Sequence, residues 1–291
     1  MKNLFQLPSI ILVSLLFLSH AAFSQSDEYK LDKSYNISAN GFINMRTNDA
    51  DIKIVGSNRD DVRVKVYRKV ESKGLASNNS EFRIDISEDG GDLVIREKRE
   101  GNSYVVMGYR KVEYKISIEA PKTAGLKING DDDDYIIENI DGNITMKVDD
   151  GDVKLSNCNG SNYDFVLDDG DVDMDGGSGN LSIRLDDGDF VVKNGNFKEI
   201  NAVTDDGDIY LETSLTNDGD YFFRTDDGGI DMTVTSGGGE FDIRHDDSRL
   251  SSSDDFRVIE KSEDETRLKL DNGTAKIRMR VNDSRIKLSR L

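Results

Sequence analysis

A short acidic motif returns along the chain at nearly equal intervals. It reads VDDGDVKL at residues 148–155, and then LDDGDVDM, LDDGDFVV, TDDGDIYL and TDDGGIDM. The steps between copies are 18 to 21 residues, and self-similarity at such a period indicates a repeat architecture. An outlying copy, FINMRTNDADIKI, lies apart at residues 42–54. Aligned on the first acid, the other copies start at Asp131, Asp149, Asp168, Asp186, Asp205, Asp226, Asp246, Asp264 and Asn282.

Apolar and polar residues alternate on both sides of each acidic motif. This alternation predicts two short strands per unit, each with one buried face, joined by an acidic turn. A glycine in the third motif position fits a turn that needs positive φ. One column of residues expected to face the interior lies five places before the first acid of each unit. It consists of Leu126, Ile144, Tyr163, Leu181, Ile200, Tyr221, Phe241, Ile259 and Ile277.

Two architectures are compatible with this pattern. The turns could close antiparallel hairpins in a long meander, which would leave a large apolar face uncovered. Alternatively, each unit could be one coil of a parallel β-solenoid, in which like residues stack in columns. We therefore predict an all-β protein, a parallel β-helix or solenoid with about nine to ten coils of 18–21 residues.

The segment between the outlying copy and the main repeats has a different character. VRVKVYRKV, EFRIDIS, DLVIREK and KVEYKISIEAP are alternating strands with turn-rich joins. We read them as a β-rich N-terminal cap or insertion, because the open end of a solenoid needs a covering element. The predicted division is a signal peptide at 1–24, a cap with the outlying repeat at 25–125, and solenoid repeats at 126–291.

The N-terminus has the pattern of a secretory signal peptide. Lys2 precedes an apolar run at residues 10–18, which is too short to span a bilayer, and a small-x-small pattern ends at Ser24. We expect cleavage after Ser24 and a secreted or periplasmic protein without a transmembrane segment. No cysteine follows the leader closely, which argues against a lipoprotein. Cys158 is the single cysteine, and we expect it to be a core residue.

These features resemble a known family. The β-rich leader segment, the IEAPKTAGLKI strand and the successive GN-I-x-V-DDGD-V-x-L units are similar to the bacterial putative-adhesin family with β-strand repeats. That family is a domain of unknown function akin to auto-transporter adhesin head domains. The resemblance covers most of residues 30–290 and implies a β-helical fold at or beyond the cell envelope. It implies no catalytic residues.

Charge is distributed unevenly along the chain. The net charge is −19, and residues 131–250 hold 32 Asp and Glu but 8 Lys and Arg, a balance of −24, which leaves +5 for the rest. Such an acidic block repels nucleic acid and attracts cations or basic partners. We therefore predict an envelope or extracellular ligand, protein or polysaccharide, and no nucleic acid.

Stacked turns would bring carboxylates within one strand spacing of each other. Three effects can offset their repulsion: hydrogen bonds from turn amides, screening by solvent and salt, and bridging by a hard cation such as Ca²⁺. No cofactor is required by any of these. If Ca²⁺ binds, its ligands are predicted in the second and fourth motif positions: Asp150, Asp152, Asp169, Asp171, Asp187, Asp189, Asp206 and Asp208.

The fourth motif position changes sign near the C-terminus, where Arg249, Arg267 and Arg285 replace the acids. Each Arg follows an acid by two residues, so cross-corner pairs with Asp247, Glu265 and Asp283 could relieve the repulsion there. The alternative is that the final coils are simply less acidic. The sign change predicts that a cation ladder ends at or before Asp227.

We expect no catalytic residues. A glycosidase needs unlike carboxylates at set separations, whereas these acids repeat identically. His245, the one histidine beyond the leader, is expected to be structural and cannot form a triad or a multi-histidine zinc site alone. The sequence therefore favours an adhesin-like interaction module. The alternatives are a polysaccharide-acting β-helix hydrolase or lyase, and a purely structural envelope spacer.

Overall fold

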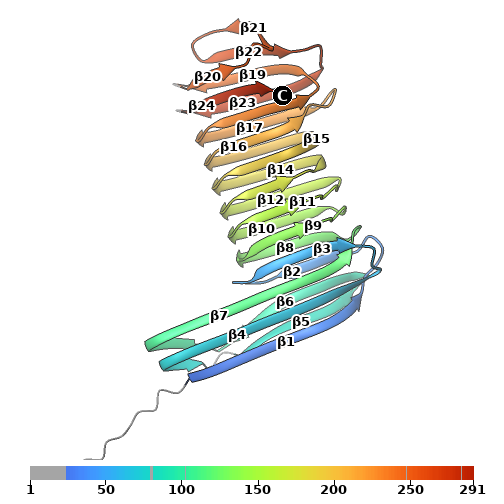
Figure 1. Ribbon diagram of the computed structural model, residues 1–291, viewed down its shortest axis with the longest axis vertical. Helices are drawn as coiled ribbons and strands as arrows, with labels where there is room; N and C mark the ends of the chain where they lie inside the picture. Colours follow the sequence, from blue (N-terminus) through green and yellow to red (C-terminus); the bar gives the residue numbers. More distant parts are fainter. Residues whose placement is uncertain (1–23, 79–80, 102, 247, 283) are drawn as a thin grey trace, which may run out of the picture.

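The computed structural model describes residues 24–78, 81–101, 103–246, 248–282 and 284–291. Its regular elements are all β-strands, and they form two facing sheets stacked into a long ladder (Figure 1). The predicted signal peptide, apart from Ser24, lies outside the described residues. None of the described residues forms a helix long and apolar enough to cross a bilayer.

Sheet A forms one face of the ladder. Its central strands pair in parallel, so that each unit contributes a strand beside the equivalent strand of its neighbour. In spatial order sheet A contains β1 (Ser24–Asn36), β4 (Asp61–Asn78), β7 (Ser103–Pro121), β3 (Asp51–Ser57), β9 (Asp134–Glu138), β11 (Val153–Ser156), β13 (Val172–Asp175), the first part of β15 (Phe190–Asp206), β16 (Ile209–Ser214), β18 (Ile230–Ser236), β24 (Arg285–Arg290) and β20 (Arg249–Ser252).

Sheet B forms the opposite face, and the long strand β15 passes from one sheet to the other. In spatial order sheet B contains β5 (Glu81–Asp89), β6 (Asp92–Glu100), β2 (Phe42–Arg46), β8 (Gly125–Asp132), β10 (Ile144–Asp150), β12 (Asn162–Asp169), β14 (Ser178–Asp187), the second part of β15, β17 (Asp220–Asp227), β23 (Ala275–Asn282), β19 (Gly239–Asp246), β22 (Glu265–Leu270) and β21 (Phe256–Lys261).

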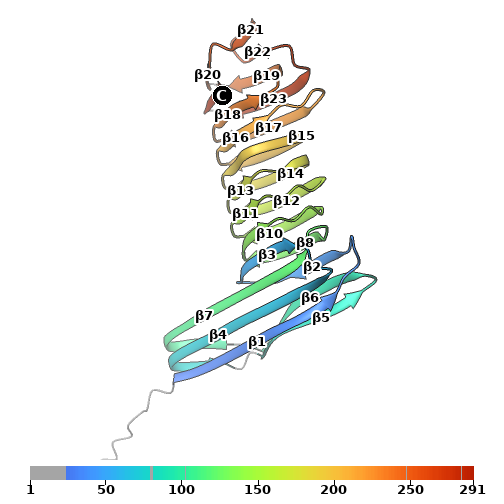
Figure 2. The same cartoon turned by 45° about the vertical axis from the view of Figure 1, so that its right-hand side comes forward.

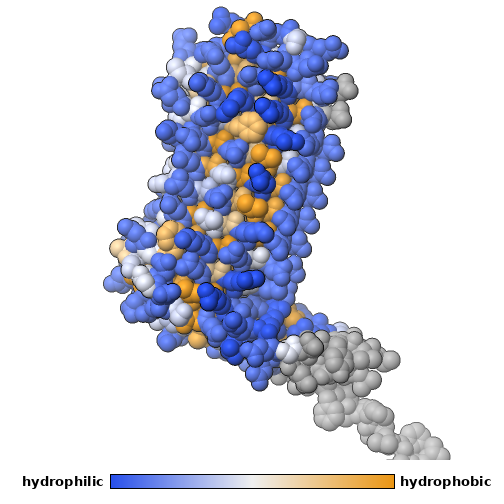
Figure 3. Space-filling view, turned by 180° about the vertical axis from the view of Figure 1, so that it is seen from behind, coloured by the Kyte–Doolittle hydropathy of each residue, from blue (hydrophilic) through white to orange (hydrophobic). Residues whose placement is uncertain are grey.

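Alternation along each strand places the apolar side chains between the two sheets. In β10, Ile144, Met146 and Val148 are buried, whereas Thr145 and Lys147 are exposed. Equivalent residues lie in register from strand to strand, so the interior consists of stacked apolar columns. The prediction of an all-β solenoid is confirmed. Seen from behind, the two long margins are hydrophilic, and apolar residues appear along the middle of the face (Figure 3).

The outlying copy at residues 42–54 belongs to the same ladder. Its strands β2 and β3 pair in parallel with β8 and β9 on one side, and with β6 and β7 on the other. Beyond them, β1, β4 and β5 pair antiparallel with their neighbours. The long strands β1, β4 and β7 project sideways past the ladder in both views (Figure 2).

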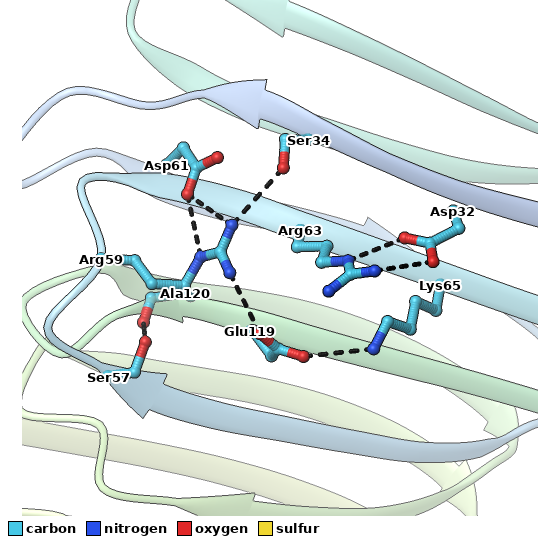
Figure 4. Close-up of polar contacts among 9 residues, drawn as sticks. All are labelled: Asp32, Ser34, Ser57, Arg59, Asp61, Arg63, Lys65, Glu119 and Ala120. Atoms are coloured by element: carbon cyan, nitrogen blue, oxygen red, sulfur yellow. Dashed lines mark hydrogen bonds and ion pairs between the residues drawn. The ribbon is translucent and has the colours of Figure 1, made fainter.

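Ion pairs join these N-terminal strands on the outer face of sheet A (Figure 4). The Arg59 guanidinium contacts Asp61 Oδ1 at 2.6 Å and Glu119 Oε2 at 3.1 Å. Arg63 donates two hydrogen bonds of 2.8 Å to the Asp32 carboxylate. Such partly exposed pairs contribute about 0–1 kcal/mol each, so they align strands more than they stabilise the fold.

The C-terminal units do not stack in the order of the sequence. Strands β23 and β24 lie between the unit of β17 and β18 and the unit of β19 and β20. The copy that starts at Asp264 is part of an antiparallel hairpin, β21–β22, in which the chain reverses direction through a Ser262–Glu265 turn. Ile259, predicted to be inward, is 47% exposed, and Lys261, which aligns with the next predicted inward column, is exposed as well.

A disulfide test distinguishes this order from sequential stacking. Asp231 of β18 lies opposite Lys287 of β24, and Lys287 lies opposite Ser251 of β20. In a Cys158→Ala background, Asp231→Cys/Lys287→Cys should cross-link within the monomer on mild oxidation, because bridgeable Cα atoms lie within about 7 Å of each other. Asp231→Cys/Ser251→Cys should not. Non-reducing electrophoresis reads both, and the reverse result would contradict the observed order.

Candidate functional site

The candidate site is the acidic edge, the stack of turns that connect sheet B to sheet A. Each turn follows a sheet B strand such as β10 and precedes a sheet A strand such as β11. The first two acids of most turns are exposed. The third position is glycine in every turn of this stack except the first. The turns of the acidic edge comprise residues 131–134, 149–152, 168–171, 186–189, 205–208 and 226–229.

The glycines hold adjacent turns in close contact. Gly188 has a φ of 140°, which other residues rarely adopt. A Cβ atom on Gly188 would lie 2.2 Å from the carbonyl oxygen of Gly170, and the same relation recurs between Gly207 and Gly188. Glycine is therefore required at this position both by its conformation and by the neighbouring turn.

The fourth-position aspartates form a hydrogen-bonded ladder. Oδ1 of Asp152 accepts the backbone N–H of Asp171 at 3.1 Å, and Oδ1 of Asp171 accepts that of Asp189 at 2.8 Å. The ladder continues through Asp208, whose Oδ1 accepts the N–H of Gly229 at 2.6 Å. One oxygen of each predicted fourth-position ligand is thus already bound to the backbone. Amide hydrogen bonding, one of the three effects considered above, operates here.

The second-position aspartates are aligned but have no equivalent amide ladder among the described contacts. Asp150, Asp169, Asp187 and Asp206 lie directly opposite one another in consecutive strands, and all four are exposed. Partial desolvation and the charges of Asp206 and Asp169 raise the pKa of Asp187 above its usual value. Negative charge is therefore concentrated along this column.

Within the described residues, no three carboxylate, imidazole or thiol side chains converge in an arrangement that would hold a metal ion. The structure brings the second-position set together as one column and the fourth-position set as another. Any cation bound along the edge would bridge carboxylates of adjacent turns.

The sign change follows Gly229, as the sequence order predicts, but a different arginine provides it. Because β24 lies beside β18, Arg285 reaches back to Asp208, with 3.7 Å between Nη2 and Oδ2. Arg267 pairs with Glu260 at 3.2 Å instead of Glu265. The predicted partners Asp247 and Asp283 lie outside the described residues. The last carboxylate of the fourth-position ladder, that of Asp208, is thus paired with Arg285, which is 77 residues further along the chain.

The sequence analysis missed Asp133, which replaces glycine in the first turn. Its side chain is fully buried and accepts hydrogen bonds from Ala50 N at 2.7 Å, Thr47 Oγ1 at 2.9 Å and Tyr135 Oη at 3.2 Å. Burial raises the pKa of Asp133 to about 6 despite these donors. The motif DDDD in place of DDGD was the available signal.

His245 and Cys158 are both buried. The Nε2 atom of His245 lies 3.1 Å from Thr266 Oγ1. Cys158 is buried among apolar residues, and burial raises the pKa of its thiol. Neither belongs to the acidic edge.

Comparisons with known proteins identify the fold. The family described as Toastrack DUF4097 matches residues 42–289. A search of the curated proteins gives no match.

Similar solved structures include two described as putative adhesins. The one from Bacteroides fragilis NCTC 9343 is 15% identical, with a TM-score of 0.48, and the match covers 89% of this chain and 97% of that one. The one from Parabacteroides distasonis ATCC 8503 is 10% identical, with the same coverage and TM-score. A "putative lipid binding protein" of the latter organism is 17% identical, with a TM-score of 0.40, covering 89% and 96%. Similarity at this level says nothing of what this chain binds.

Replacing a stacked glycine should destabilise the solenoid strongly. We expect Gly188→Ala to lower the free energy of unfolding by about 3 kcal/mol or more, since it adds both backbone strain and a clash with the Gly170 carbonyl. The control is Gly90→Ala, where φ is also positive but no atom lies within 4 Å of the new Cβ. That change should cost about 1 kcal/mol. Equal losses in urea unfolding would show that the turns do not press on each other.

Asp133 should make stability depend on pH. Between pH 3.8, its ordinary pKa, and about 6, the folded state holds a proton that the unfolded state has lost, so stability falls as pH rises through this window. The loss is about 3 kcal/mol. Asp133→Asn should remove this pH-dependent loss. The free energy of unfolding of the variant, measured with urea, should therefore increase relative to that of the wild type between pH 4 and 7. The exposed Asp131→Asn variant is the control. A difference that does not change with pH would mean that Asp133 is not buried as a charge.

Proposed function

The chain belongs to the Toastrack DUF4097 family, and from this premise we propose that it is an exported, non-enzymatic interaction module. Its acidic edge binds cationic partners at the cell surface or in the envelope, with Ca²⁺ as the proposed bridging ion. The family supplies the solenoid. The function is argued from the charges that the solenoid aligns.

The alignment of the second-position column carries the proposal. Asp150, Asp169, Asp187 and Asp206 lie in register, one strand spacing apart, which is about 4.8 Å. Their repulsion opposes folding, so any cation that binds the folded edge relieves it and is bound more tightly as a result. A rigid column also loses little conformational entropy on binding.

Calcium suits this arrangement better than metals with strict geometry. It takes six to eight oxygen ligands at flexible angles and binds carboxylates and carbonyls. The second-position carboxylates and the Oδ2 atoms of Asp152, Asp171 and Asp189 are the proposed ligands, whereas Oδ2 of Asp208 is already bound by Tyr210 and Arg285. Bridging between adjacent turns would let several weak sites act along one edge, which suits millimolar extracellular calcium.

A binding role accounts for these carboxylates better than catalysis. Glycoside hydrolysis needs two carboxyl groups with unlike environments that face one another across the substrate. Along the acidic edge the exposed acids share one environment, and the unlike acid, Asp133, directs its carboxylate at donors inside the fold. The leader-like N-terminus supports export to the periplasm or beyond, where an adhesin-like role would be exercised.

A calcium titration tests the proposal. At about 5 mM Ca²⁺ the wild-type Tm should rise by about 4 °C or more relative to NaCl of matched ionic strength. Asp169→Asn/Asp187→Asn should lose most of this rise. Asp164→Asn/Asp173→Asn removes the same charge from the flat faces of the sheets and should retain it.

An equal response in both double variants would indicate general screening and no site along the edge. A wild-type Tm that Ca²⁺ leaves unchanged would end the calcium proposal. Product release from neutral or acidic polysaccharides incubated with the protein would favour the hydrolase or lyase alternative and contradict a non-enzymatic role.

A further inference from the structure

A basic surface lies on the outer face of sheet B, near the N-terminal end of this acidic protein. There the strands β6, β2 and β8 border a depression of about 750 Å³. Charged and amide side chains dominate its lining, and Asp89 and Glu97 are its acidic members. We call it the basic depression, defined by Asn44, Arg46, Arg96, Lys98, Lys127 and Asn129.

Strand pairing sets the positions of these side chains. Arg46 of β2 lies directly opposite Arg96 of β6, and on its other side it lies opposite Asn129 of β8. Lys127 lies opposite Asn44 in the neighbouring column. Arg46, Arg96, Lys98 and Lys127 are exposed. Two guanidinium groups therefore start from adjacent strands on the same face, with a lysine one strand away.

Asp89 also lines the depression, and the three other nearby carboxylates, those of Glu97, Asp85 and Asp92, are bound to other groups. Glu97 accepts hydrogen bonds from Arg99 Nε and from the backbone N–H of Asn48, and Arg99 also pairs with Asp49 at 2.8 Å. On the other side of β6, Asp85 of β5 lies directly opposite Arg96, and its carboxylate contacts Arg83 at 3.1 Å. Glu97 is nearly enclosed, with its side chain 6% exposed.

Asp92 is engaged in the same way. It accepts hydrogen bonds from Phe42 N at 2.8 Å and from Asn44 Nδ2 at 3.2 Å. In the part of the chain that the structure describes, neither Arg46 nor Arg96 forms an ion pair with a carboxylate. Two like charges are thus held side by side without a protein counter-ion, an arrangement that an anionic ligand would relieve.

We propose that the basic depression binds a sulfate or phosphate ester group carried by a carbohydrate chain. A single arginine fork matches the two oxygens of a carboxylate, whereas two arginines and Lys127 offer donors for the three free oxygens of an ester group. The amides of Asn44 and Asn129 add donors and acceptors that suit sugar hydroxyls.

A carbohydrate fits this surface better than a membrane. The basic depression lies on a sheet face that is continuous with strands leading into the acidic edge, whose charge repels an anionic bilayer. A single chain can follow the face without bringing a charged plane against that edge. This site is separate from the acidic edge, so its test is independent of the calcium proposal.

Isothermal titration with a sulfated hexasaccharide, its desulfated counterpart and inorganic sulfate tests the inference. The sulfated chain should bind, and Arg46→Gln/Arg96→Gln should weaken that binding by about tenfold or more. Arg184→Gln is the matched control, because Arg184 is exposed in the same outward column but lies between Val166 and Val203. It should change affinity less than about twofold.

Three results would overturn the inference. Equal weakening by Arg184→Gln and by the double variant would indicate general electrostatics. Equal binding of the desulfated chain would show that the ester group is not recognised. Binding to vesicles containing phosphatidylglycerol, with none to the sulfated chain, would assign the surface to membranes. Unchanged strand circular dichroism and Tm in the double variant show that the readout reports binding and not unfolding.

Discussion

From the second acidic turn onward, each turn lies directly against the backbone of the turn before it, and this contact leaves no space for a Cβ atom. Glycine at the third motif position meets that constraint, as Gly188 does against the Gly170 carbonyl. Once the turns are fixed at one strand spacing, the strands on either side are fixed in register as well. The stacked apolar columns of the interior then follow from simple alternation.

The same contact creates the electrostatic problem that defines the surface. Carboxylates in equivalent positions are brought together whether or not they attract a partner. The repulsion between the fourth-position acids is offset within the fold, because each of them accepts a hydrogen bond from a backbone N–H of the next turn. The second-position acids remain exposed in a column, so they are the charges available to the environment. The fold thus uses one carboxylate oxygen of each fourth-position acid, and the proposed binding uses the second-position acids together with the remaining fourth-position oxygens.

The ladder departs from its repeat where it begins and where it ends. At the first turn Asp133 replaces glycine, and its buried carboxylate holds the preceding copy through Ala50 and Thr47. Near the other end, Arg285 lies over the last carboxylate of the fourth-position ladder, and an antiparallel hairpin covers the outermost strand. At both places the residues involved differ from the repeat motif, and a comparison with the motif alone would classify their units as degenerate copies.

The sequence by itself determined the strands, the turns and the interior columns, because alternation and turn glycines are local properties. It also identified the fourth-position aspartates, and amide bonding was among the roles considered for them. Only the tertiary structure decided that β24 pairs with β18, and that Arg46 lies beside Arg96 fifty residues away. Parallel strand edges offer nearly identical hydrogen-bonding groups, so local sequence does not specify which edge a strand will join. Packing of the whole interior makes that choice, and with it the surfaces on which charges meet.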